Sequence, residues 1–283
     1  MRLVLTLLVR DEADIADDMI GYHLAQGVDF VIATDNRSTD ATRSILEKYQ
    51  RRRRLLVIDE LDDDFNQTQW VTRMARLAYT DYAADWVINS DADEFWWPKV
   101  GNLKSTLAAI PEEHGVVIAD RTNFLPAPNT GEGIEHMIYR WVESVNALGR
   151  PLPPKVCHRA NPDVIVAMGN HSIEQPSTTS HPGRPIEIFH YPLRAYKQFE
   201  RKIALGGAAL ARNREFPHRV VPTWRMLYDL LTDGRLEDYY AQESLDQERL
   251  ATAIQNGRVV IDRRLGGYLR EMRAELLAQG LRR

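Results

Sequence analysis

Cysteine is almost absent from this sequence, since Cys157 is the only one among 283 residues. A single thiol cannot form a disulfide within the chain, and it is too few for a zinc site built from cysteines. No apolar stretch approaches the roughly 18 residues that a membrane-spanning helix needs. These absences predict a chain without disulfides or a transmembrane segment. We expect it in the reducing cytoplasm, with peripheral membrane contact left open.

Neither sign of charge is in large excess, because 36 Lys and Arg face 40 Asp and Glu, for a formal net charge of -4. A slightly anionic protein has no general attraction to nucleic acid or to anionic membranes, both of which are polyanions. The run Arg51 to Arg54 is the strongest local exception. It follows a predicted helix, whose last turn favours cations, so we interpret it as a solvated helix end. We therefore predict no nucleic-acid partner.

The order of apolar segments indicates the fold class. Over the first ~120 residues, short apolar runs alternate with helical patterns, as is typical of a parallel sheet with crossover helices. Helical patterns dominate from Arg194 onward. We predict an α/β fold with a mostly parallel central sheet flanked by helices and a helical C-terminal region. The predicted strands of the first part are Leu3 to Val9, Val28 to Thr34, Leu55 to Ile58 and Trp86 to Asn89.

Acidic residues follow the last of these strands, where open α/β sheets bind ligands. In Asp91-Ala92-Asp93, two carboxylates separated by one small residue can share a hard divalent cation with a diphosphate. Magnesium and manganese prefer such oxygen ligands. The alternative is a solvated acidic turn, since Asp-x-Asp is a short motif. The apolar strand before it and Phe95-Trp96-Trp97 after it favour a buried setting.

A second polar segment, Asp35 to Asp40, follows the second predicted strand and opens a helix. A carboxylate at this position can accept the imide proton of uracil or contact a ribose. The helix start adds unpaired backbone N–H groups. The alternative is a plain helix cap formed by Ser38 or Asp40, which is compatible with ligand binding.

Histidines and isolated cations provide further candidates. His171 follows Met168-Gly169-Asn170, where a tight turn can expose the ring, and His190 ends the strand-like run Ile186 to Phe189. Both rank above the remaining histidines, because a lone histidine is more often a hydrogen-bonded structural group. Lys155 and Arg194 are candidate partners of phosphate oxygens. The alternative for these two cations is a surface charge.

Three segments taken together resemble a known family. Leu3 to Glu12, Asp35 to Thr42 and Asp91 to Phe95 look like the successive nucleotide-sugar-binding elements of the family-two-like glycosyltransferases with a GT-A fold. The resemblance is clear over about residues 1–100. It continues more loosely through Phe189 to Arg194 and Phe199 to Lys202, which look like a segment of that family's bacterial branch.

The resemblance implies an activity and a division of the chain. It implies transfer of a sugar from a UDP- or GDP-linked donor to a saccharide or lipid-linked saccharide acceptor, with inversion favoured. Surface-polysaccharide assembly is the expected setting. We expect a catalytic domain over residues 1–215, with a nucleotide-binding half in 1–100 and an acceptor and metal half in 101–215. A helical extension would occupy residues 216–283.

The resemblance also implies roles for residues near the nucleoside. Arg10 and Glu12 would border the base, and Asp35 would contact uracil or ribose. The family's usual second aspartate is Asn36 here, and its usual glycine is Arg37. These two departures leave the preferred nucleotide open.

Three residues are implied at the metal. Asp91 would reach the ribose or the metal, Asp93 would be the chief metal ligand, and His190 would complete the metal or diphosphate site. The expected cofactor is Mn²⁺ or Mg²⁺.

The general base is not identified by the sequence. An inverting transferase needs a base within hydrogen-bond reach of the acceptor hydroxyl, and the candidates are His171, Glu174 and Asp120. Two alternative functions come from other classes. One is a metal-dependent phosphoester hydrolase, and the other is an inactive relative that retains the nucleotide pocket.

Overall fold

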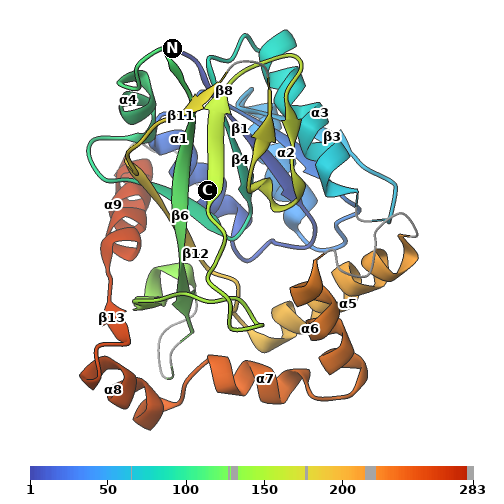
Figure 1. Ribbon diagram of the computed structural model, residues 1–283, viewed down its shortest axis with the longest axis vertical. Helices are drawn as coiled ribbons and strands as arrows, with labels where there is room; N and C mark the ends of the chain where they lie inside the picture. Colours follow the sequence, from blue (N-terminus) through green and yellow to red (C-terminus); the bar gives the residue numbers. More distant parts are fainter. Residues whose placement is uncertain (65, 127, 129–132, 176–177, 214–220, 279–283) are drawn as a thin grey trace. The chain divides into compact units, whose positions relative to one another are not determined.

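The structure is a computed structural model that describes residues 1–64, 66–126, 128, 133–175, 178–213 and 221–278 (Figure 1). Its contacts divide the chain into two compact units. Unit 1 comprises Met1–Asp62, Asn66–Arg121 and Pro153–Phe189, and unit 2 comprises Asp63–Phe65, Thr122–Leu152 and His190–Arg283. The expected boundary between residues 215 and 216 lies outside the described residues.

Unit 1 alternates strands and helices in its first half and is rich in short strands in its second. Its elements are β1 (Leu3–Val9), α1 (Ala16–Ala25), β2 (Phe30–Asp35), α2 (Thr42–Arg51), β3 (Leu55–Asp59), α3 (Gln67–Thr80), β4 (Trp86–Asp91), β5 (Glu94–Pro98), α4 (Leu103–Ala108), β6 (His114–Leu125), β8 (Lys155–Arg159), β9 (Ile165–Val166), η2 (Met168–Asn170), β10 (Ile173–Glu174), β11 (Thr179–Ser180) and β12 (Ile186–His190). The last residues of β6 and β12 belong to unit 2.

The sheet of unit 1 has a parallel half and an antiparallel half. Strands β3, β2, β1 and β4 are neighbours in this order, and all three pairings are parallel. Beyond β4, strand β8 pairs antiparallel with both β4 and β6. The predicted α/β class is confirmed, but the prediction of a mostly parallel sheet is wrong beyond β4. Since β4 runs into β5 through a tight turn and not through a crossover helix, the parallel pattern ends there.

Helix α3 covers the parallel half through a face of small and medium apolar residues. Val71, Met74 and Ala78 recur at spacings of three and four, which places them on one side of the helix. They pack against Val4 and Ile32 of the two central strands. This packing fixes the parallel strands whose carboxyl ends carry the polar segments.

Helix α1 holds β5, the strand that follows the acidic turn. The hydroxyl of Tyr22 donates to the carbonyl oxygen of Trp96 at 2.9 Å. The backbone N–H of Trp96 donates to Nε2 of His23 at 3.3 Å. Trp96 is fully buried, and the ring of Trp97 stacks on Phe189 with 5.2 Å between centroids. Both tryptophans therefore belong to an aromatic core.

Unit 2 is mainly helical, as predicted for the region after Arg194. Its elements are η1 (Ile134–His136), β7 (Tyr139–Trp141), α5 (Tyr196–Arg212), α6 (Pro222–Thr232), α7 (Leu236–Glu243), α8 (Gln247–Gln255), β13 (Val259–Ile261) and α9 (Arg264–Ala278). Strand β7 pairs antiparallel with β13 and with the last residues of β6. Within the described part of the chain, the helices are all too short or too polar to cross a membrane.

Candidate active site

The carboxyl ends of three parallel strands meet at one edge of the unit 1 sheet. Val9 lies beside Asp35 in the register of β1 and β2, and Leu8 lies beside Asp91 in the register of β1 and β4. The segment that begins at Arg10 therefore leaves the sheet between the ends of β2 and β4. The structure thus brings together at this edge the three polar segments that the sequence singled out.

The turn between β4 and β5 concentrates three carboxylates. Asp91 ends β4 and Glu94 begins β5, so only Ala92 and Asp93 separate the strands. The backbone N–H of Asp91 donates to Oε2 of Glu94 at 3.2 Å. Asp93 and Glu94 are buried, whereas the side chain of Asp91 is 34% exposed. Asp91 is therefore the carboxylate of this turn that is most open to a ligand.

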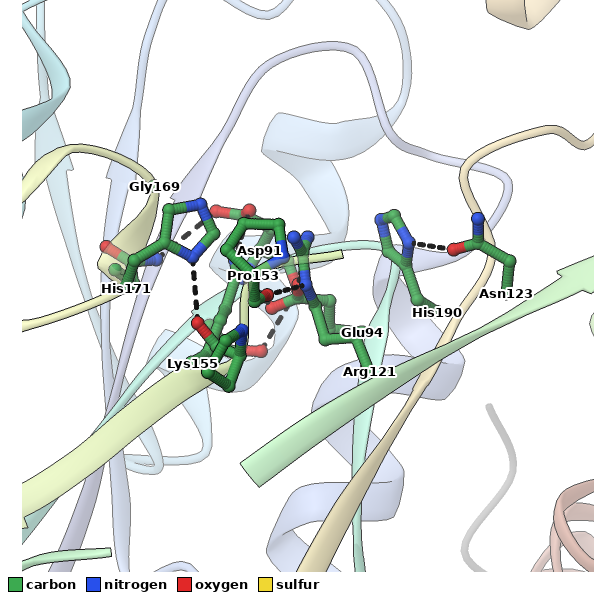
Figure 2. A network of polar contacts seen from close by, with 12 residues as sticks. Asp91, Glu94, Arg121, Asn123, Pro153, Lys155, Gly169, His171 and His190 are labelled. Atoms are coloured by element: carbon green, nitrogen blue, oxygen red, sulfur yellow. Dashed lines mark hydrogen bonds and ion pairs between the residues drawn. The ribbon is translucent and has the colours of Figure 1, made fainter. Parts of the chain in front are cut away.

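Two cations from neighbouring strands face this turn (Figure 2). Nζ of Lys155, in β8, lies 2.5 Å from Oδ2 of Asp91 and 2.8 Å from Oε2 of Glu94. Nη1 of Arg121, in β6, lies 3.6 Å from Oε1 of Glu94, and its Nε donates to the carbonyl oxygen of Pro153 at 3.0 Å. Burial raises the pKa of Glu94 to about 7, against the lowering effect of the Lys155 ammonium. Lys155, predicted to meet phosphate, thus has its ammonium between two carboxylates.

The short helix η2 brings Asn170 and His171 to the same edge. Gly169 and Asn170 have left-handed backbone angles, with φ of 71° and 59°, which confirms the tight turn predicted there. Nδ2 of Asn170 lies 3.5 Å from Oδ1 of Asp91. Nδ1 of His171 donates to the carbonyl oxygen of Pro154 at 2.9 Å, so Nε2 carries the ring's lone pair. Burial, with the nearby charge of Arg121, lowers the pKa of His171 to about 4 and keeps the ring neutral.

At the end of β2, side chains fold the chain into a compact loop. Oδ1 of Asp35 accepts the backbone N–H of Ser38 at 3.1 Å, and Oδ2 lies 3.6 Å from Nη1 of Arg43. Oδ1 of Asp11 accepts the backbone N–H groups of Thr39 at 2.7 Å and Asp40 at 3.2 Å. Asp11 itself has a left-handed φ of 55°. The carboxylates at this edge therefore organise the start of α2.

Asn36 stands where the family that the sequence resembles usually has aspartate. Both its amide nitrogen and its amide oxygen form hydrogen bonds. Nδ2 donates to the carbonyl oxygens of Asp62 at 2.7 Å and Glu60 at 3.3 Å. Oδ1 accepts from Nη1 of Arg10 at 3.4 Å. An aspartate has no N–H to donate to the two carbonyls, so the departure from the family pattern has a structural reason.

The other candidate bases lie in more exposed settings within unit 1. Asp120, in β6, has a side chain that is 64% exposed, and its Oδ2 lies 3.6 Å from Nε of Arg184. Glu174 is exposed in β10, which pairs with β9.

Glu12, which was expected to border the nucleobase, is buried. Its backbone N–H donates to Oγ1 of Thr42 at 2.9 Å.

Two candidates belong to unit 2. Nδ1 of His190 donates to Oδ1 of Asn123 at 2.7 Å. Nη1 of Arg194 donates to the carbonyl oxygen of Tyr191 at 2.9 Å, and the Arg194 side chain is buried. Both contacts lie within unit 2, and the roles expected for the two side chains at the metal and the phosphates stay predictions.

Sequence reasoning did not single out Glu94, Arg121 and Asn170. Glu94 had a usable signal, since a carboxylate directly followed by Phe95 and two tryptophans is drawn into the core and needs a partner there. Arg121 and Asn170 carry no such signal. Their place depends on the pairing of β6 with β8 and on the left-handed turn of η2.

The carboxylates of the turn between β4 and β5 are the candidate ligands of a divalent cation. Among the residues that the structure describes, no group of three or more His, Cys, Asp or Glu side chains is arranged to hold a metal ion. Asp91 and Asp93 nevertheless provide two carboxylates in one turn. A protein usually supplies one or two carboxylates to a magnesium ion, and waters and substrate phosphates complete the coordination. The residues present therefore fit a cation that arrives with a diphosphate.

Comparison with known proteins adds a family. The model of glycosyltransferase family 92 matches residues 15–225, about three quarters of the chain. A search of curated protein sequences finds no significant match.

Several solved structures share a distant likeness with the chain. S. aureus TarS 1–349 in complex with UDP-GlcNAc has 13% identity and a TM-score of 0.41, over 91% of this chain and 93% of that chain. The match to S. aureus TarS has 14% identity and a TM-score of 0.39, over 85% of this chain and 44% of that chain, so the present chain spans less than half of it. Glucosyl-3-phosphoglycerate synthase from Mycobacterium tuberculosis, in complex with Mn²⁺, UDP and glucosyl-3-phosphoglycerate, has 16% identity and a TM-score of 0.31, over 42% of this chain and 44% of that chain.

Proposed function

Because the chain belongs to glycosyltransferase family 92, we propose that it transfers a sugar from a nucleotide-diphosphate donor, UDP- or GDP-linked, to a saccharide or lipid-linked saccharide. The observation that carries this proposal is the convergence of Arg10, Asp35 and Asp91 at one sheet edge. Ligands of open α/β sheets bind at such edges. We assign the donor to residues 1–100 and the acceptor to residues 101–215.

Asp93 and Asp91 are the residues that would hold a Mn²⁺ or Mg²⁺ ion together with the donor diphosphate. When bound, the ion supplies Lewis-acid stabilisation of the charge that develops on the departing nucleoside diphosphate. The protein's own contribution is to fix the two carboxylates in a turn between buried strands. Arg10, Glu12 and Asp35 would position the nucleoside beside them.

An inverting reaction needs a base that removes the proton of the acceptor hydroxyl. His171 is supported by its geometry, because Nδ1 donates to the carbonyl oxygen of Pro154 and Nε2 is therefore the ring nitrogen that can accept a proton. Glu174 and Asp120 stay candidates, although Asp120 already pairs with Arg184. We propose inversion with His171 as the first residue to test.

The experiment compares Asp93→Asn with the wild type in a transfer assay. UDP- and GDP-linked sugars are incubated with Mn²⁺ or Mg²⁺ and a panel of saccharide acceptors, and the products are detected by mass spectrometry. Asp93→Asn should abolish transfer while the protein stays folded by circular dichroism, because it removes a ligand charge and keeps the side-chain volume. Asp163→Asn, at an exposed position in unit 1, is the matched control and should transfer like the wild type.

Two outcomes would contradict the proposal. Full transfer by Asp93→Asn would show that this carboxylate is not needed for the reaction. Release of nucleotide or phosphate at the same rate with and without acceptor would indicate a hydrolase that uses the same carboxylates.

A further inference from the structure

The ammonium of Lys155 is enclosed by the protein. The side chain is 1% exposed although it carries a charge, and its Nζ contacts Oδ2 of Asp91 and Oε2 of Glu94. A buried lysine needs such partners, since an unpaired charge in the interior is strongly disfavoured. Its position between two carboxylates differs from that of a surface lysine that reaches out to a phosphate.

Strand pairing explains why Lys155 arrives at this place. In the antiparallel register, Trp86 lies opposite Arg159 and Ile88 opposite Cys157. Extending this register by two residues places Lys155 opposite Ser90, the neighbour of Asp91. Lys155 thus comes from β8, the strand beside the end of β4, and it is 64 residues away from Asp91 in the sequence.

The two oxygens of Asp91 have different surroundings. Oδ2 lies against the enclosed Lys155 ammonium at 2.5 Å, whereas the contact of Oδ1 with Nδ2 of Asn170 is long, at 3.5 Å. The Asp91 side chain is 34% exposed although its Oδ2 is paired with the enclosed ammonium, so part of this side chain is open to a ligand. Glu94 contacts the same ammonium and is fully buried (Figure 2).

We propose that Lys155 is a positioning residue of the donor site, which anchors Oδ2 of Asp91 so that Oδ1 faces the cation and nucleotide. Lys155 acts through Asp91 and touches neither donor nor acceptor. Its second contact balances the charge of Glu94, which allows that carboxylate to be buried beneath the turn. This inference rests on the proposed function, because it takes Asp91 to be a ligand of the donor or its cation.

The test is a double-mutant cycle between Lys155 and Asp91. Glu94 keeps the guanidinium of Arg121 and the backbone N–H of Asp91 as partners when Lys155 is changed, and Lys155 keeps Glu94 when Asp91 is changed, so the wild-type protein is the background. Lys155→Met, Asp91→Asn and the combination are compared with it. Calorimetry measures the affinity for Mn²⁺ alone and for UDP and GDP in the presence of Mn²⁺, and circular dichroism checks that each variant is folded.

Lys155→Met should weaken binding by about tenfold when Asp91 is present, as is typical for a residue that orients a metal ligand. When Asp91→Asn is also present, the same change should have less than a roughly twofold effect, because the oriented carboxylate is already gone. A merely structural lysine would weaken binding equally in both settings, and that additive result would overturn the inference.

The cycle also separates this inference from the proposed function. If the wild type binds the Mn²⁺–nucleotide complex but transfers no sugar, the proposed reaction fails while the cycle still decides the role of Lys155. If transfer occurs and the cycle is additive, the positioning role alone fails. If the wild type binds neither Mn²⁺ nor nucleotide, both are overturned. Should Lys155→Met not fold, Lys155→Arg replaces it; retained binding that still depends on Asp91 would support the anchor, and binding that no longer depends on Asp91 would overturn it.

Discussion

Asn36→Asp would bring the sequence closer to the pattern that it resembles, yet we expect this change to destabilise unit 1. Asn36 is buried, and its amide N–H groups donate to the carbonyl oxygens of Asp62 and Glu60. A carboxylate would face both carbonyls with negative oxygens. Only the contact with Arg10 would become stronger.

The magnitude follows from the hydrogen bonds. Each net hydrogen bond contributes ~1 kcal/mol, and a buried polar group left without a partner costs about 1–3 kcal/mol. The loss of two bonds by Asn36→Asp, partly offset by Arg10, should therefore lower the free energy of unfolding by roughly 2–4 kcal/mol at pH 7. Asn36→Ala is the control, since it loses the same bonds without adding a charge, and it should cost less.

Urea unfolding followed by circular dichroism measures both variants. The difference between Asn36→Asp and the wild type should shrink on acidification, because a protonated carboxyl group can donate to Asp62. An Asn36→Asp variant that is as stable as the wild type, or more stable than Asn36→Ala at pH 7, would refute the explanation of this departure from the family pattern.

Two further perturbations test the interior of each unit. Burial lowers the pKa of both His23 and His158 from 6.5 to about 4. The free energy of unfolding should therefore be at its full value above pH 6.5 and should decrease as the pH drops toward 4, by about 3 kcal/mol at most for each ring. Thermal unfolding midpoints measured from pH 7.5 to 4 follow this loss of stability, and the loss should be smaller in His23→Gln. A wild-type midpoint that does not change with pH would contradict the prediction. In unit 2, Gly207→Ala should destabilise by about 1–3 kcal/mol, because a Cβ there would lie 2.7 Å from Cβ of Tyr228 on the facing helix. Chemical denaturation that finds Gly207→Ala as stable as the wild type would exclude the close packing of α5 and α6.

The sequence was sufficient for the fold class and for the class of enzyme. It predicted an α/β fold and a glycosyltransferase, and both are confirmed, with a sheet that is partly antiparallel. The family is family 92, whereas the sequence resembled family two. The donor, the acceptor, inversion and the metal stay proposals, since they depend on ligands that local patterns do not specify.

Local patterns determined the parallel half of unit 1, because apolar runs and helical periods are encoded within a few neighbouring residues. Once β1, β2 and β4 are parallel, their carboxyl ends share one edge, so the convergence of Arg10, Asp35 and Asp91 followed from the sequence. Only the tertiary structure decided what these side chains meet. Strand direction and register beyond β4 depend on contacts between distant segments, and they place the Lys155 ammonium against Asp91 and Glu94. The sequence determines which charges exist, but burial and strand pairing determine which of them are paired inside the protein and which stay exposed.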